Sequence, residues 1–97
     1  MLDIFLTAEA KYDLHDIHNY IARNNLNAAI KIIEDIYKAF DQIALYPFSG
    51  NMRLDLTIKN LRFKYVRSYV IIYDPHTDPV KIIRVLNSQR NIKNMNH

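Results

Sequence analysis

The residues of this sequence that could do chemistry are mainly cations in its second half. Arg62 and Lys64 alternate with apolar residues in LRFKYVR, and Arg84 stands inside the apolar run IIRVL. Arg90 follows beyond that run. Guanidinium and ammonium groups bind phosphates and carboxylates, so these four side chains form a candidate surface for an anionic target.

Arg84 raises a sharper question than the other three cations. A permanent charge inside an apolar run is costly unless an acid pairs with it or it serves a site. The sequence therefore predicts either an internal carboxylate partner for Arg84 or a functional contact. Arg90 lies past the run and is the better candidate for contact with an anionic target.

Three tyrosines, Tyr65, Tyr69 and Tyr73, are interleaved with these cations. Together they could bind nucleic acid, because bases stack on aromatic rings while basic side chains contact phosphates. Aromatic residues are also common strand formers, and for each tyrosine taken alone we favour packing within a sheet.

Support for an ordinary catalytic centre is weak. His15 and His18 lie three residues apart, a spacing that would allow a metal pair on a helix, but no third ligand can be identified. Asp13 and Asp16 indicate instead that this helix face is solvated. With no cysteine and a single glycine, a thiolate site and a phosphate-cradling loop are excluded. We therefore predict no metal and no cofactor, and the pattern leans away from an enzyme.

The composition indicates one domain over residues 1–97, with a tail from about residue 93 that we expect to be frayed. The net charge of +3 hides an uneven distribution. Residues 1–46 carry four lysines and arginines against seven acids, whereas residues 47–97 carry nine against three. The split suggests separate partners for separate faces, one of them anionic, although an uneven scatter of solvated charge would look the same.

Localisation is inferred from what the sequence lacks. No apolar run approaches the ~20 residues that cross a bilayer, and the N-terminus has neither the basic segment nor the long apolar segment of a secretory signal. We expect a cytoplasmic protein.

A strand and a first helix are expected at the start of the chain. Residues 2–6 (LDIFL) favour a short strand. Thr7 can then cap a helix that ends at Asn24 and Asn25. The apolar residues of this helix recur at spacings of three and four, at Ala10, Leu14, Ile17 and Ile21.

A second helix follows after a short connection. Asn27 is its expected cap, and Tyr46-Pro47 ends it because the residue before proline is pushed out of the helical region. Its apolar stripe consists of Ala29, Ile33, Ile36, Phe40 and Ile43. Because only a few residues join the helices, we expect an antiparallel hairpin whose stripes face a common third element.

The second half of the chain supplies that element as a sheet. Residues 48–60 favour a loop with one short edge strand, and residues 61–67 alternate between apolar and basic residues as a strand would. Residues 69–74 (YVIIYD) are apolar on both faces, as expected of a central strand, and residues 75–79 (PHTDP) are typical of a turn. Residues 80–87 (VKIIRVLN) form the last strand.

The order β-α-α-β-β-β predicts an α+β fold, with an N-terminal helical hairpin packed on one face of a mainly antiparallel sheet. Because the helices cover one face only, we expect the other face to be open and to invite a partner.

Read together, these segments resemble a known family. AEAKYDLHDIHNYIARNNLNAAIKIIEDIYKAFDQIALYP is similar to the helical hairpin of ParE-like proteins. ALYPFSGNMR, followed by NLRFKYVRSYVIIYDPHTDPVKIIRVLNSQRNI, resembles the ParE/RelE superfamily of bacterial toxins from type II toxin–antitoxin modules. The resemblance covers roughly residues 3–92.

The resemblance implies a RelE/ParE-like fold and a growth-inhibiting toxin of the kind linked to plasmid stabilisation, with no cofactor. Such toxins are encoded beside an antitoxin, ParD-like or similar, whose C-terminal segment wraps and neutralises them. ParE-like members poison DNA gyrase, whereas RelE-like members cut messenger RNA on the ribosome. For this chain we expect the ParE-like branch, with gyrase as the target and with target-binding residues Arg62, Lys64, Arg84 and Arg90.

The ribonuclease branch is less well matched. RelE-type members place an arginine in the central strand at about the position of Val70, and a tyrosine or histidine near the C-terminal end, where this chain has Asn87 and Asn94-Met95-Asn96. Of that catalytic set only Arg90 is retained, and one group cannot easily both activate the 2′-hydroxyl and protonate the leaving oxygen. ParE-like chains usually carry His-Gly or a similar pair where this one has Asn87-Ser88. A ribosome-dependent mRNA endoribonuclease and a degenerate, non-toxic binding module therefore stay as alternatives.

Overall fold

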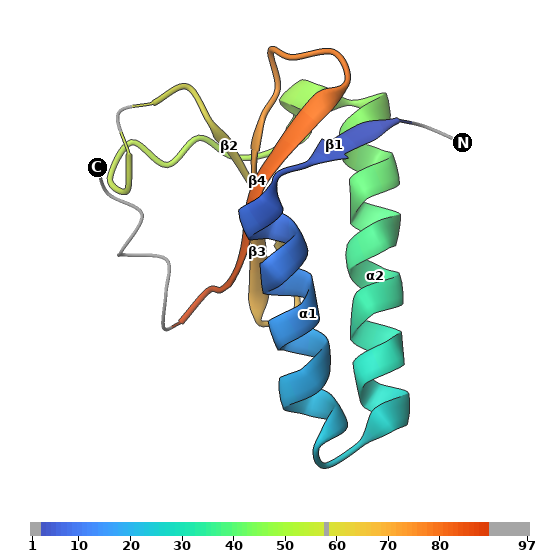
Figure 1. Cartoon of the computed structure of the whole chain (residues 1–97). Helices are drawn as coiled ribbons and strands as arrows, with labels where there is room; N and C mark the ends of the chain where they lie inside the picture. Colours follow the sequence, from blue (N-terminus) through green and yellow to red (C-terminus); the bar gives the residue numbers. More distant parts are fainter. Residues whose placement is uncertain (1–2, 58, 90–97) are drawn as a thin grey trace.

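The helical hairpin lies along one face of a four-stranded sheet in the computed structural model, which describes residues 3–57 and 59–89 (Figure 1). The elements are β1 (Ile4–Leu6), α1 (Ala8–Ala22), α2 (Leu26–Leu45), β2 (Arg62–Val66), β3 (Tyr69–Asp74) and β4 (Val80–Asn87). A short 3₁₀ helix, η1 (Pro47–Ser49), follows α2. The predicted α+β class and the order β-α-α-β-β-β are confirmed.

The start of α1 follows the sequence prediction. The Oγ1 of Thr7 accepts a hydrogen bond from the backbone N–H of Ala10 at 3.0 Å, so Thr7 is the N-cap. Ala10, Leu14 and Ile17 are buried, as their spacing predicts. The strand before the helix covers Ile4–Leu6, and residue 2 of the predicted strand lies outside the described residues.

The predicted cap of α2 is wrong. Asn25, not Asn27, is the N-cap, and its Oδ1 accepts from the backbone N–H of Ala28 at 3.0 Å. The backbone N–H groups of Asn24 and Asn25 both bond to the carbonyl oxygen of Ile21, at 3.1 and 3.0 Å. Because α1 closes this tightly, the chain is already extended at Asn25 and α2 begins at the next residue. The end of α2 at Leu45, before Tyr46-Pro47, agrees with the prediction.

The strands are ordered β1-β4-β3-β2, with β1 parallel to β4 and both other pairs antiparallel. Val70–Tyr73 of β3 are completely buried, as expected of a central strand. β2 is one residue shorter at each end than the predicted 61–67. Leu61 donates its N–H to the carbonyl of Lys59, and Arg67 has a positive φ of 54° in the turn to β3.

The main core lies between the hairpin and the sheet. Its buried members are Ala10, Leu14, Ile17, Ile36, Ala39, Phe40, Ile43, Ile71, Tyr73, Val80, Ile82 and Val85. Both predicted helical stripes thus face the sheet. No helix in the described part of the chain is long and apolar enough to span a membrane.

The expectation of an open apolar face on the far side of the sheet is wrong. Phe63, Val70 and Ile72 on that side are completely buried and form a second cluster with Leu56 and Leu86. The segment before β2 reaches this face because Asn51 and Phe63 exchange two backbone hydrogen bonds, at 2.8 and 2.7 Å. This isolated bridge takes the place of the predicted edge strand.

Candidate functional site

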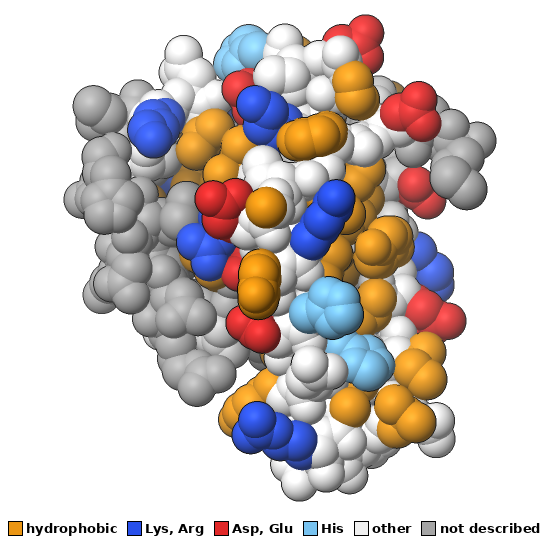
Figure 2. Space-filling view, viewed as in Figure 1, with side chains coloured by type: hydrophobic (Ala, Val, Ile, Leu, Met, Phe, Trp, Pro, Cys, Tyr) orange, Lys and Arg blue, Asp and Glu red, His pale blue; other side chains and the backbone are white. Residues whose placement is uncertain are grey.

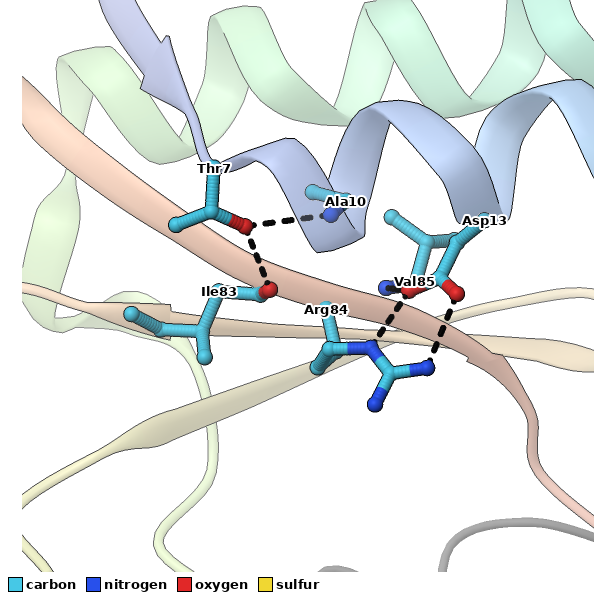
Figure 3. Close-up of polar contacts among 6 residues, drawn as sticks. All are labelled: Thr7, Ala10, Asp13, Ile83, Arg84 and Val85. Carbon is cyan, nitrogen blue, oxygen red and sulfur yellow. Dashed lines mark hydrogen bonds and ion pairs between the residues drawn. The ribbon is translucent and has the colours of Figure 1, made fainter.

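Arg84 has an internal partner, Asp13 of α1 (Figure 3). Its Nε and Nη2 donate to the two carboxylate oxygens of Asp13 at 2.8 and 2.9 Å. The backbone N–H of Val85 donates to the same carboxylate at 2.9 Å. A charged fork of this geometry is strong and directional. The sequence left open an internal acid or a functional contact, and the internal acid is confirmed.

The prediction that Asp13 lies on a solvated helix face is therefore wrong. Only 12% of its side chain is exposed, against 34% of the side chain of Arg84. The sequence contained a signal for this that was missed. Asp13 lies three residues after Ala10 and four before Ile17, so it falls on the apolar stripe that packs against the sheet. An acid at a core-facing position needs a partner, and Arg84 is the cation that α1 reaches.

Local backbone geometry brings the pair together. Ile72 of β3 lies opposite Arg84, but Tyr73 lies opposite Ile82, so Ile83 is an extra residue in a β-bulge. Bulges re-aim neighbouring side chains, and here Arg84 is directed at α1. Thr7 holds the start of α1 at the same place, because its hydroxyl donates to the carbonyl oxygen of Ile83 at 2.8 Å (Figure 3).

Arg84 nevertheless keeps one donor free of described partners. The hydrogen bonds that Arg84 donates to Asp13, together with the negative charges of Asp13 and Glu9, raise the pKa of Arg84, so the group stays charged. No described residue accepts a hydrogen bond from its Nη1, which points away from α1 in Figure 3. The contact of Arg84 with a target stays a prediction, and Nη1 is the nitrogen that could make it without breaking the pair with Asp13.

Arg62 holds the segment that follows α2. Its Nη1 donates to the carbonyl oxygens of Phe48 and Gly50, at 3.2 and 3.0 Å, and its guanidinium carbon lies 5.4 Å from the centre of the Phe48 ring. The N–H of Gly50 donates to the hydroxyl of Tyr73 at 3.0 Å. Gly50 is needed for space rather than for its backbone angles, because an added Cβ would lie 2.5 Å from that hydroxyl oxygen.

Lys64 is the least engaged of the described predicted cations. It lies opposite Ile71 and Arg62 lies opposite Tyr73, so both cations stand on the helix side of the edge strand β2. No ion pair links Lys64 to any residue in the described ranges. The structure thus brings Arg62 and Lys64 together, places Arg84 two strands away, and leaves Arg90 outside the described residues.

The interleaved tyrosines do not form a stacking surface. Tyr73 is completely buried, and its burial raises the pKa of its hydroxyl. Tyr69 packs against the main core, while Tyr65 is 40% exposed and accepts a hydrogen bond from Arg53, a residue that the sequence argument did not single out. The packing role that we favoured is confirmed for Tyr69 and Tyr73.

The structure also shows the surroundings of the two histidines considered as metal ligands and of the positions where the ribonuclease branch has catalytic residues. Among the described residues no three histidine, aspartate or glutamate side chains converge as metal ligands, so His15 and His18 gain no third ligand there. Val70 is completely buried in the far-side cluster. The Oδ1 of Asn87 accepts from the backbone N–H of Gln89 at 2.9 Å. Neither of the last two positions offers a group that could donate or accept a catalytic proton.

Comparison with known proteins places this arrangement in a family. A chain from the chromosomal ParDE TA system of P. aeruginosa has a similar structure, with a TM-score of 0.74 over 92% of this chain and 98% of that one. At 17% sequence identity this likeness establishes the fold alone. No curated protein matches the sequence. The family model described as the ParE toxin of the type II toxin–antitoxin system parDE matches residues 4–92, and the chain therefore belongs to the ParE toxin family.

Proposed function

We propose that this ParE-family chain inhibits growth by binding and poisoning DNA gyrase in the cytoplasm, and that a cognate ParD-like antitoxin neutralises it. The observation that carries the proposal is the match to the ParE toxin family over residues 4–92. The finer claim, that the target is gyrase and the action is binding, is supported by the character of the candidate residues.

Those residues are suited to binding rather than to catalysis. At Val70, where the ribonuclease branch would carry an arginine, a completely buried apolar side chain cannot reach a substrate. Arg84 is already neutralised by Asp13. What the described surface does offer is an edge of positive charge on β2, and such an edge suits a target that presents acidic side chains or DNA phosphates.

The deciding experiment is a DNA supercoiling assay with purified chain and purified gyrase. We expect inhibition that rises with the concentration of the chain and reaches completion near stoichiometric amounts. Unchanged supercoiling at a large molar excess would overturn the proposal.

A substitution locates the surface. Lys64→Gln removes an unpaired charge from β2 and should raise the half-inhibitory concentration several-fold with no change in Tm. Lys38→Gln, an exposed lysine of α2, is the matched control and should leave inhibition unchanged.

Two alternatives give different outcomes in the cell. A ribosome-dependent ribonuclease would produce codon-phased cuts in translated messages by primer extension, lost in Arg90→Ala. A non-toxic binding module would leave growth unaffected on induction. The antitoxin is sought in a neighbouring reading frame of roughly 60–100 residues, the size of a small DNA-binding domain with a tail that is disordered until bound. Its co-purification with the chain is the expected result.

A further inference from the structure

Three large apolar residues stand exposed together where α2 ends. Leu45 is the last residue of α2, Tyr46 follows it and Phe48 lies in η1, and their exposed fractions are 56%, 67% and 55%. In Figure 1 this end of α2 lies at the same end of the molecule as the β3–β4 turn, far from the connection between the helices. Figure 2 shows a histidine and apolar side chains at that end. We call Leu45, Tyr46 and Phe48 the η1 patch.

Phe48 is exposed and yet held in place. Its ring packs edge-to-face against the ring of His76 in the β3–β4 turn, with 5.4 Å between the ring centres, and the guanidinium of Arg62 lies over it. His76 is held in turn by Asp74, whose Oδ1 accepts from the backbone N–H of His76 at 2.9 Å and lies 3.2 Å from its Nδ1. A side chain that is already fixed loses little conformational freedom when a partner covers it, so Phe48 is preorganised for binding.

The need to hold η1 in place does not explain the aromatic ring. The bonds that fix this segment end on backbone atoms, because Arg62 donates to the carbonyl oxygens of Phe48 and Gly50. The N–H of Ser49 donates to the carbonyl oxygen of Tyr46 at 3.0 Å. Any residue at position 48 could accept the bond from Arg62. A single exposed apolar side chain is ordinary, but three adjoining ones, two of them aromatic, have the composition of a protein interface.

The margin of the η1 patch is positive on the side of β2. Arg62 uses Nη1 for its carbonyl bonds, and its Nε and Nη2 donate to no residue in the described part of the chain. Lys64 lies two residues further on the same face of β2 and forms no ion pair with a described residue. The patch therefore combines an apolar centre with two cations that can still donate hydrogen bonds from where they stand.

These charges favour a different protein over the other occupants of such a patch. A second copy brought here by a two-fold axis would set its own Arg62 and Lys64 against the same cations. A nucleic acid needs a row of cations for its phosphates, whereas the chain around His76, beside Phe48, carries Asp74 and Asp78. A protein that presents an apolar pocket with carboxylates on one side of it meets neither obstacle.

We infer that the η1 patch is the anchor through which the chain binds its target. Phe48 enters an apolar pocket of the target, and Leu45 and Tyr46 exclude water around it. Arg62 and Lys64 pair with carboxylates beside that pocket, so the basic edge of β2 orients the target while the patch supplies most of the affinity. This inference rests on the proposed function, because it specifies the surface by which the chain holds gyrase.

The test is the supercoiling assay with purified gyrase and variants of the full chain. Phe48→Ala should raise the half-inhibitory concentration by roughly ten-fold or more, as the loss of a central aromatic anchor does. Tyr46 is the most exposed of the three residues, so Tyr46→Ala should keep Tm nearly unchanged and still raise that concentration several-fold. Leu26→Ala is the matched control, because Leu26 is 56% exposed at the opposite end of α2; it should inhibit within about two-fold of wild type.

Salt separates the apolar anchor from the cations. Raising the ionic strength screens the charge pairs of Lys64, so the ratio of half-inhibitory concentrations between Lys64→Gln and wild type should shrink. The same ratio between Phe48→Ala and wild type should persist, because burial of an aromatic ring is not screened by salt.

The outcomes separate the inference from the proposed function. Inhibition by Phe48→Ala and Tyr46→Ala as strong as that of wild type would overturn the inference and leave the proposed function standing. An equal loss in Leu26→Ala would overturn it as well, since no particular surface would then be responsible. Self-association of the wild-type chain in analytical ultracentrifugation that Phe48→Ala abolishes would assign the patch to a second copy instead. If wild type does not inhibit gyrase, both fail.

Discussion

Removing the carboxylate of Asp13 should destabilise the fold more than removing any exposed acid. Three hydrogen bonds end on this group, two from the guanidinium of Arg84 and one from the backbone N–H of Val85. Breaking a buried ion pair by deleting one partner costs about 3–5 kcal/mol. Arg84 is 34% exposed, so water can reach part of its head group, and we reduce the expected loss for Asp13→Ala to about 2–3 kcal/mol.

A loss of that size is easily measured. The loss is a large part of the free energy of unfolding of a domain this size, which is about 5–15 kcal/mol. Each 1 kcal/mol lowers the Tm of such a domain by roughly 4–8 °C, so Tm should fall by roughly 10–20 °C. Urea unfolding followed by circular dichroism on Asp13→Ala, Arg84→Ala and the double variant would give the coupling energy of the pair, which should be about 1–2 kcal/mol. Asp16→Ala, an exposed acid of the same helix, should change stability by less than about 0.5 kcal/mol. A value as small for Asp13→Ala, or additive effects in the cycle, would refute the reasoning.

Three further predictions test other parts of the structure. Asn25→Ala should destabilise the chain by about 1 kcal/mol in urea unfolding, whereas Asn27→Ala should change it by only a few tenths, because only the first side chain caps α2. Gly50→Ala should cost about 1–3 kcal/mol, and the cost should shrink in a Tyr73→Phe background, which lacks the hydroxyl that the new Cβ would meet; equal costs in both backgrounds would contradict the steric cause. The hydrogen bond that Arg67 donates to Asp35 holds the pKa of that carboxyl below its usual 3.8. The charged carboxylate of Asp35 therefore stabilises the fold above about pH 4, and this stabilisation is lost as the pH falls through the lowered pKa. Thermal unfolding should therefore find Asp35→Asn less stable than wild type at pH 7, and the difference should vanish as the pH falls through the lowered pKa of Asp35.

Periodicity and end signals in the sequence predicted most of the fold. The stripes of both helices, the Thr7 cap and the full extent of β4 depend on local spacing, and each agrees with the structure. The cap of α2 could not be predicted in this way, because Asn24, Asn25 and Asn27 are equally good cap residues by type. The choice among them is made by how tightly α1 closes, which is a property of the folded hairpin.

The far side of the sheet shows a second limit. The apolar residues of β3 on both faces were evident, but the sequence does not indicate which part of the loop before β2 would cover them. Leu56 joins that cluster through a backbone turn on Arg53 and the Asn51–Phe63 bridge. The bridge is a non-local contact, which periodicity cannot detect. The inference of an open face failed for this reason.

The position of Arg84 changes how the positive half of the chain is interpreted. The sequence predicted Arg62, Lys64, Arg84 and Arg90 as target-binding residues, with an internal acid as the other possibility for Arg84. In the structure Arg84 is neutralised by Asp13 and Arg62 is committed to the carbonyls of Phe48 and Gly50. Neither can move to a target without releasing the contact that holds α1 or η1 in place. A target that engages Arg84 must therefore use its remaining Nη1 or compete with an internal carboxylate 71 positions away in the chain. Lys64 carries no such penalty, and among the described candidates it is the cation most able to bind a target without loss of stability.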